Sequence, residues 1–354
     1  MLPSVGEWDA DDVLPEAAMR RMIDLGITGA LVPEQYGGPG LGVADLVPVW
    51  RALSQGWISL TGAVNPTGLA TALLVRHGTD AQRERWLPPI AAGEVLASFS
   101  ITEPQAGSDL SRMEMEATVH PERGLVLHGT KRWVAGGASA PVIFMLAEIQ
   151  GERSCIVLPS DGRGEEGWIV GDLDKIGYRG VESAAYHFDA FHAPGAEVLG
   201  NDIGAGARQM LDALDVGRVN VACRALGIID RALGRALEEC RDREIGDGVL
   251  GDHTHAQLRV GELIARRDAV EALIDSAAAA SDARDGTARE LTAAAKVVAS
   301  DTAIWAVDCA SRLAASRSYT ASDELARLRR DAPQTQIGEG ANDALLFALA
   351  RAVI

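Results

Sequence analysis

The chain has 354 residues, of which 47% are hydrophobic and 23% charged, and its formal net charge is -17. This composition is that of an ordinary globular protein with ample length for a core, and it excludes disordered and collagen-like classes. The negative charge argues against a non-specific nucleic-acid binder and a polybasic membrane-surface protein, because both depend on a positive field. We therefore expect neither nucleic acid nor a membrane as a partner.

The N-terminal residues carry Glu7 and Asp9 where a secretory signal would have basic and then apolar residues. No apolar run approaches the roughly 20 residues of a membrane helix. Four cysteines are scattered without a Cys-x-x-Cys pair, which favours reduced thiols over a zinc site or a disulfide framework. We expect a cytoplasmic protein without a metal site.

The first quarter of the chain has a helical pattern. From about residue 11 to residue 94 the apolar residues recur mostly at helical spacing. The segment PEQYGGPG at 33–40 interrupts this pattern, because its Pro and Gly residues favour a turn. A helical N-terminal domain is the expected structure.

The pattern then changes to strands and back to helices. Between about 96 and 199, short apolar runs at 142–146, 155–158 and 185–188 are separated by Gly, Pro and Asp clusters. After residue 204 the helical period returns, and one helix face is expected to carry Leu226, Ile229, Leu233 and Leu237. The order predicts an α+β protein in which helical layers pack on a middle sheet or barrel.

Two segments of the middle region resemble known cofactor-binding motifs. Residues 102–109 read TEPQAGSD and residues 129–134 read GTKRWV. Together they resemble the two flavin-loop signatures of the acyl-CoA dehydrogenase family. Further segments similar to that family follow in the same order over nearly the whole chain: 32–38, 78–88, 175–180, 188–194 and 330–340.

The resemblance implies an acyl-CoA dehydrogenase-like fold with three domains. These are an N-terminal helical domain at residues 1–95, a central β domain at 96–200 and a C-terminal four-helix bundle at 201–354. It also implies a homo-oligomer, either a dimer or a tetramer, with flavin at a subunit interface. An electron-transfer flavoprotein is the usual electron acceptor in the family.

The same resemblance assigns residues to an FAD site. Thr102 and Ser108 are the expected polar partners of the flavin ring and the pyrophosphate, and Gly107 lies in the same loop. Trp133 is expected to pack against the isoalloxazine, because an aromatic face suits a large planar ring. Arg243 and Arg312 are expected to reach the cofactor from the C-terminal domain of a neighbouring protomer.

The family's reaction removes a proton from the carbon next to a thioester carbonyl and a hydride from the following carbon. Its base must be partly desolvated, and the developing enolate oxygen needs fixed hydrogen-bond donors. By resemblance, Glu339 is the base and its N–H is one donor. Gly338 and Gly340 are expected to let the backbone approach the substrate, and Arg218 to lie near the cleft. Relatives that place the base on a bundle helix have it where this chain has Gly217.

Several family positions differ in this chain. Ala135 stands where a Thr or Ser usually bonds to the reactive edge of the flavin. The segment 243–247 keeps its Arg but lacks the aromatic residue that covers adenine. The segment 312–318 lacks the family's glycines, so its Cβ atoms are expected to obstruct a pyrophosphate. Arg312 and Arg317 are then either phosphate clamps or surface charges.

The leading hypothesis is FAD-dependent α,β-dehydrogenation of an acyl thioester, carried by coenzyme A or an acyl carrier protein, with Glu339 as the base. The altered second half of the flavin site leaves an alternative. The chain would then be a flavin-poor acid/base enzyme, or one subunit of a hetero-oligomeric dehydrogenase whose related partner supplies the missing half. A flavin oxygenase is a third, weaker reading, because such an enzyme needs no α-proton base.

Overall fold

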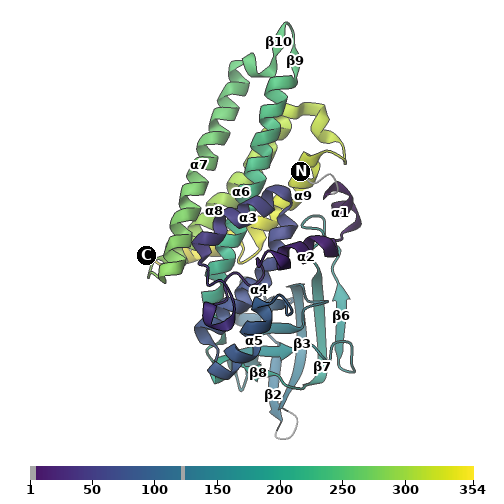
Figure 1. Cartoon of the computed structure of the whole chain (residues 1–354), viewed down its shortest axis with the longest axis vertical. Helices are drawn as coiled ribbons and strands as arrows, with labels where there is room; N and C mark the ends of the chain where they lie inside the picture. The colour runs from purple at the N-terminus through teal and green to yellow at the C-terminus, as the bar shows by residue number, and fades with distance from the viewer. Residues whose placement is uncertain (1–4, 121–123) are drawn as a thin grey trace.

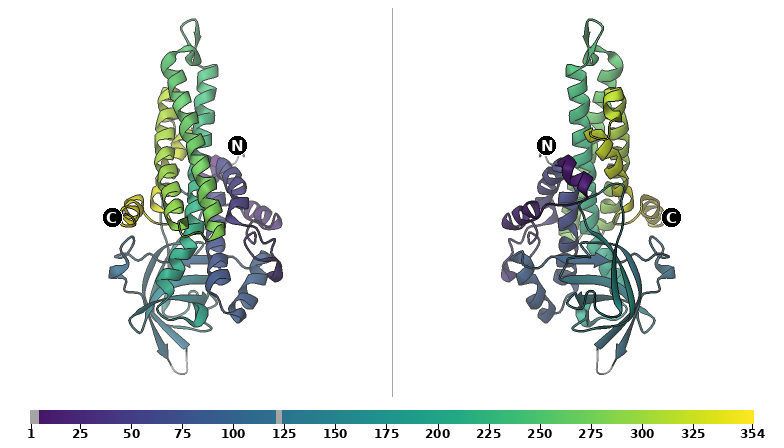
Figure 2. Two further views of the ribbon diagram at one scale, coloured as in Figure 1. Left: turned by 90° about the vertical axis from the view of Figure 1, so that its left-hand side faces the viewer. Right: turned by 90° about the vertical axis from the view of Figure 1, so that its right-hand side faces the viewer.

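The computed structural model describes residues 5–120 and 124–354. N-terminal helices and a β-sheet form one end of the molecule, and a long helical bundle extends from them (Figure 1). Two views turned by 90° show the same division, with the sheet below the bundle (Figure 2). The predicted order of helices, strands and helices is therefore confirmed.

The N-terminal helices pack around α4. The helices of this part are α1 (Val5–Asp11), α2 (Glu16–Asp24), α3 (Val43–Gly56), α4 (Ile58–His77) and α5 (Asp80–Ala91). By length and composition α4 could cross a membrane, but 83% of its apolar window is buried inside the protein. Its Thr67 hydroxyl also accepts a hydrogen bond from the Ala97 N–H at 3.0 Å. We therefore identify α4 as a core helix that also holds the sheet.

The middle of the chain forms one mixed sheet. Its strands are β1 (Ala97–Ser100), β2 (Glu116–His120), β3 (Gly124–Ala135), β4 (Val142–Ile149), β5 (Glu152–Pro159), β6 (Trp168–Asp172), β7 (Ser183–Ala193) and β8 (Glu197–Val198). The strand order is β6-β7-β3-β1-β4-β5-β8, and β2 pairs with both β3 and β4. Strands β1 and β4 run parallel, whereas β3 and β7 are antiparallel.

Strand β4 is apolar from Val142 to Ala147 because both of its faces are buried there. Phe144 and Leu146 belong to the large core shared with the helices. Ile143 and Met145 point to the opposite face, where a second core contains Trp168 among other aromatic residues. The sheet thus separates two hydrophobic cores, and only one of them touches the helical bundle.

The C-terminal part is dominated by α6, the longest helix of the described chain. Its helices are α6 (Gly206–Asp242), α7 (Thr254–Ala283), α8 (Ala288–Ala314), α9 (Glu324–Ile337) and α10 (Asn342–Arg351). A short hairpin of β9 (Glu244–Ile245) and β10 (Gly248–Val249) joins α6 to α7 at the tip of the bundle (Figure 1). Helix α6 packs against α3, α4, α7, α8 and α9 and against strand β5.

The buried face of α6 differs in part from the predicted leucine stripe. Leu226 and Ile229 are fully buried as expected, but Leu233 is only half-buried. In the outer half of the helix the fully buried positions are taken by Ala232 and Ala236. Small side chains let neighbouring helices approach closely there, so the outer half of the bundle is narrower than a leucine stripe would make it.

A buried ion pair ties the loop after β1 to strand β3. The Lys131 ammonium lies 2.7 Å from a Glu103 carboxylate oxygen, and both side chains are 0% exposed. Glu103 also accepts hydrogen bonds from the backbone N–H groups of Glu114 and Met115. Lys131 also donates to the Ile101 carbonyl at 2.8 Å. Because both charges are paired and hydrogen-bonded, the pair fixes the loop at residues 102–109 against the sheet.

We predict that Lys131→Met lowers the free energy of unfolding by about 3–5 kcal/mol, because it leaves the Glu103 carboxylate buried without its counter-ion. Urea denaturation followed by circular dichroism measures this loss. The matched control is Arg85→Met, which removes a partly exposed ion pair with Glu197 and should cost less than about 1 kcal/mol. Equal losses of unfolding free energy in the two variants would show that the buried Lys131–Glu103 pair contributes no more to stability than an exposed pair.

Candidate active site

Glu339 lies in the tight turn between α9 and α10. Its backbone has φ 51°, a left-handed conformation that is uncommon for a residue with a side chain and occurs often at functional sites. The side chain is 13% exposed. Its Oε1 atom accepts a hydrogen bond of 2.5 Å from the Asn65 amide on α4. Oε1 also lies 3.7 Å from the Arg224 guanidinium on α6. The carboxylate therefore sits where α4, α6 and the turn meet.

Lys296 on α8 holds this turn from inside the protein. Its ammonium donates to the carbonyls of Gln336 at 2.9 Å and Gly340 at 2.7 Å, on either side of Glu339. A third bond of 2.8 Å goes to the Asn342 side chain at the start of α10. The side chain is fully buried, and burial lowers the pKa of Lys296 to about 8. One ammonium thus satisfies three acceptors and fixes both ends of the turn.

The glycines predicted near the substrate lie around Glu339. Gly338 follows the end of α9 and Gly340 has φ 102°, a conformation that favours glycine. A Cβ atom at position 217 of α6 would lie 2.9 Å from the Glu339 Cγ. The two base positions that the family resemblance offered, 217 and 339, are therefore in contact in this fold. A side chain at 217 would make Glu339 or Leu69 shift.

Arg218 is buried beside the same carboxylate. Its guanidinium pairs with Asp215 at 3.0 Å, and the side chain is 6% exposed. Burial lowers the pKa of this guanidinium, while the negative charges of Asp215 and Glu339 act in the opposite direction. The structure thus places Arg218 within electrostatic range of Glu339, with its own counter-ion.

Three residues at this site were missed by the sequence reasoning: Asn65, Arg224 and Lys296. Arg224 and Lys296 carry a sequence signal, since each is a lone cation inside an apolar helical run, VACRAL at 221–226 and AAAKVV at 293–298. A cation in such a run is either buried with hydrogen-bond or charged partners, or it costs free energy as an unpaired buried charge. Asn65 carries no comparable signal, because amides are common on helices.

The two flavin-loop motifs also meet in space. The N–H of Arg132, next to Trp133, donates to the Thr102 carbonyl at 2.8 Å. Gly107 and Ser108 are exposed, and a Cβ at position 107 would meet nothing within 4 Å. These residues form an open ledge beside strand β3. No hydrogen bond or ion pair joins this ledge directly to Glu339 in the part of the chain that the structure describes.

Trp133 is the notable residue of this ledge. Its side chain is 55% exposed although it lies within strand β3, and its backbone has φ 60°. A large aromatic residue that is both exposed and in the left-handed region costs free energy twice, once for hydration and once for the backbone. An exposed indole face fits a planar ring system, so this part of the chain suits a flavin.

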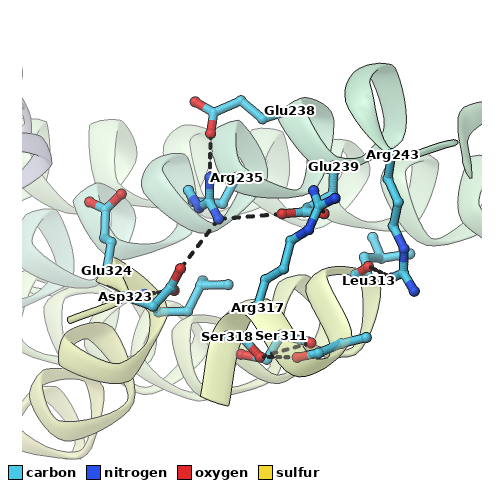
Figure 3. Close-up of polar contacts among 12 residues, drawn as sticks. Arg235, Glu238, Glu239, Arg243, Ser311, Leu313, Arg317, Ser318, Asp323 and Glu324 are labelled. Carbon is cyan, nitrogen blue, oxygen red and sulfur yellow. Dashed lines mark hydrogen bonds and ion pairs between the residues drawn. The ribbon is translucent and has the colours of Figure 1, made fainter. Parts of the chain in front are cut away.

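The other residues expected to contact FAD lie at the outer end of the bundle and bind groups of their own chain (Figure 3). Arg243 donates to the Leu313 carbonyl at 2.8 Å. Arg317 pairs with the buried Glu239 at 3.1 Å. Arg312 pairs with Asp308 at 2.8 Å, and both side chains are exposed. Arg243 and Arg317 are therefore bound to groups of their own chain, whereas the pair of Arg312 is a weak one on the surface.

The backbone beyond α8 keeps a shape that suits glycine although glycine is absent. Ala315 has φ 52° and ψ -130°, a combination that glycine adopts far more readily than alanine. The Ser318 hydroxyl lies within hydrogen-bond distance of the Ser311 and Ala315 carbonyls, so its one proton can be donated to either, and this contact closes the segment (Figure 3). The backbone at Ala315 thus has a conformation typical of glycine, and a methyl group stands there, as the missing glycines of 312–318 imply.

Comparison with known proteins agrees with this geometry. Models of the acyl-CoA dehydrogenase N-terminal, middle and C-terminal domains match residues 1–94, 98–191 and 204–354. The chain is 28% identical to an acryloyl-CoA reductase (NADH) of Anaerotignum propionicum, over 99% of this chain and 90% of that protein. It is also 28% identical to a glutaryl-CoA dehydrogenase of Desulfococcus multivorans, over 96% of this chain and 89% of that one.

A solved structure shows the same likeness in three dimensions. The butyryl-CoA dehydrogenase of Megasphaera elsdenii superposes with a TM-score of 0.93 at 28% identity, covering 99% of this chain and 93% of that one. The match extends over all three parts of the fold, in the order in which they occur here. This chain belongs to the acyl-CoA dehydrogenase family and is an oxidoreductase of the acyl-thioester dehydrogenase type.

Proposed function

We propose that Glu339 is the base that removes the α-proton in the dehydrogenation of an acyl thioester. The observation that carries this assignment is a partly buried carboxylate of which only one oxygen is held. Oε1 is bound by Asn65 and lies beside Arg224, whereas Oε2 makes no hydrogen bond among the described residues. A base needs such a free lone pair within a fixed frame.

The backbone around Glu339 supports the second half of this proposal. The Glu339 N–H makes no hydrogen bond in the described part of the chain, while the carbonyls on either side are bound by Lys296. We assign this N–H to the developing enolate oxygen, because a fixed and unused donor stabilises charge without reorganising. Gly338, Gly340 and Arg218 are assigned to the substrate side of the same turn.

We further propose FAD as the cofactor, since members of this family are flavoproteins. When bound, FAD accepts the hydride that leaves the β-carbon of the acyl group. Thr102, Gly107, Ser108 and Trp133 would hold it, and the open ledge around Trp133 supports this placement. We expect an acyl thioester of coenzyme A or an acyl carrier protein as substrate and an electron-transfer flavoprotein as acceptor.

The outer end of the bundle gives the alternative a specific basis. There Arg243, Arg312 and Arg317 bind their own chain, and Ala315 stands in the tight turn. In a homo-oligomer, this end of the bundle would cover the FAD of a neighbouring protomer. These arginines would then have to break their contacts within the chain in order to bind the cofactor. A hetero-oligomer with a related chain would not require this. We therefore keep both assemblies within the proposal, each with Glu339 as the base.

Two further expectations from the sequence remain part of the proposal. The domain boundaries at 95/96 and 200/201 fall between the end of α5 at Ala91 and the start of β1 at Ala97, and between β8 and α6. A cytoplasmic location stays a prediction.

The first test is Glu339→Gln, which keeps the shape of the side chain and removes the base. We expect the rate of flavin reduction by an acyl-CoA substrate to fall by about 10²- to 10⁴-fold, because that is the usual contribution of a positioned base. Stopped-flow absorbance of the flavin measures it. The matched control, Asp343→Asn, changes an exposed carboxylate four residues away and should leave the rate unchanged. A Glu339→Gln enzyme with bound flavin and full activity contradicts the assignment.

Lys296 is predicted to be a positioning residue. Replacement by Met removes all three bonds to the turn, so kcat should fall at least about 10-fold while the KM for substrate changes less. Steady-state kinetics at a checked flavin content separates the two parameters. Ser300→Ala serves as control, since Ser300 touches Asn342 from the same helix without binding the turn's carbonyls. Parallel changes in kcat and KM in both variants would argue for a general loss of structure.

The flavin assignment is tested with the chain purified alone. We expect its visible spectrum, recorded with added FAD and after removal of the excess, to show near-stoichiometric flavin. Trp133→Ala should weaken FAD binding by about 10-fold, through loss of the aromatic contact. Trp305→Ala, which removes a tryptophan stacked on Arg266 in the bundle, should not change it. A colourless protein that ignores added FAD would favour a partner subunit or flavin-independent chemistry.

A further inference from the structure

We propose that Arg224 is a specificity-determining residue that binds a carboxylate carried by the acyl group of the substrate. The inference rests on the proposed function, because it places the acyl group beside Glu339. It goes further by naming the chemical class of that acyl group. The substrate is the thioester of a dicarboxylic acid, and Arg224 selects it over an uncharged acyl chain.

The first observation is the burial of Arg224 in the middle of α6. Its side chain is only 1% exposed, and it is among the largest fully buried side chains of the described residues. A guanidinium stays charged in a protein, so its burial is costly unless anions and acceptors surround it. Helix α6 places Leu226 and other apolar residues in neighbouring positions, where a smaller apolar residue would pack without that cost.

The second observation is that Arg224 is left incompletely bonded. Nε donates to the Asn220 side chain at 2.8 Å, which is a good hydrogen bond. Nη1 makes only a long contact of 3.4 Å to the Gln334 amide oxygen. Nη2 is buried and makes no hydrogen bond at all in the described part of the chain. The Glu339 oxygen nearest to it is 3.7 Å away, beyond hydrogen-bond distance.

The third observation is the charge around Glu339. Arg218 has its own counter-ion in Asp215, and Lys296 feels the negative charge of Asp301 as well as that of Glu339. Among the described residues, Glu339 is the one carboxylate within 4 Å of the Arg224 guanidinium. Lys296 makes its bonds to two carbonyls and an amide oxygen. Tyr178 lies under the Arg224 guanidinium, 5.2 Å from ring centroid to Cζ, and burial raises the pKa of its phenol to about 12. The ring is therefore neutral and offers no negative charge to Arg224.

A substrate carboxylate supplies a negative charge and the acceptors that Arg224 lacks. The free edge of Arg224 offers N–H groups on Nη1 and Nη2, and a carboxylate can accept from both at once. Gln334 and Glu339, which cover this edge, are partly exposed. A ligand that enters beside Glu339 reaches Arg224 by displacing the long Gln334 contact. A plain alkyl chain would leave the N–H groups of Arg224 without acceptors. The site would therefore bind the carboxylated acyl group more tightly than the uncharged one.

Binding is measured separately from turnover in the Glu339→Gln enzyme loaded with FAD. Calorimetry compares glutaryl-CoA with pentanoyl-CoA, and succinyl-CoA with butyryl-CoA, pairs that match in chain length and differ in the terminal carboxylate. We expect at least one carboxylated ligand to bind about 10- to 100-fold more tightly than its uncharged counterpart. Arg224→Leu and Arg224→Lys should remove most of that preference, the latter because it loses the forked geometry.

The control is Arg231→Gln on the same helix, which removes an ion pair with Glu324 away from the site and should keep the preference. If the Glu339→Gln enzyme binds both members of each ligand pair equally, the inference is overturned, even if the enzyme with Glu339 in place dehydrogenates them. A folded Arg224→Leu variant of this Glu339→Gln enzyme that loses affinity equally for all four ligands also overturns it, since Arg224 would then only maintain the shape of the site. A different result would count against the proposed function alone: a clear preference for the carboxylated ligands, together with no turnover of them by the enzyme that keeps Glu339.

Discussion

The close approach of helices to α6 is the constraint on which the rest of the structure depends. A Cβ atom at position 227 would lie 2.4 Å from the Ser54 side chain of α3, and one at 217 would lie 2.9 Å from Glu339. Glycine at these two positions lets α3 and the turn after α9 reach the same helix. Helix α6 also packs on β5. The same helix therefore positions both the sheet and the turn after α9.

Around that helix the protein keeps its charges inside and in contact with one another. Arg218, Arg224 and Lys296 approach Glu339 from two helices, and Asn65 approaches it from a third. Buried charges lower stability unless each is matched, and hydrophobic replacements would often be neutral or better. Their concentration at one turn agrees with the proposed role of Glu339 as a base. The ordinary apolar cores on either side of the sheet supply the stability that this arrangement costs.

The sequence predicted the order of elements well because hydrophobic period and turn residues are local. Strands β4, β5 and β7 and helix α6 were all recognisable, and the flavin-loop motifs were found by resemblance. The partners of Glu339 were not, since Asn65, Arg224 and Lys296 come from three distant segments and meet only through packing. The contacts of Arg317 were equally out of reach, because no sequence rule pairs it with Glu239, 78 positions earlier. Local patterns specify elements, and packing specifies their neighbours.

If FAD covers the exposed, left-handed Trp133 as proposed, the lifetime of this protein depends on the supply of that cofactor. A group that binds only the folded chain adds RT ln(1 + [L]/Kd) to its stability, about 2.7 kcal/mol at a hundredfold excess over Kd. Without that ligand strand β3 carries an uncovered indole two residues from the buried Lys131–Glu103 pair. In a cell short of flavin, newly made chains would thus be more exposed to proteases and to aggregation, and the amount of folded protein would follow the flavin pool.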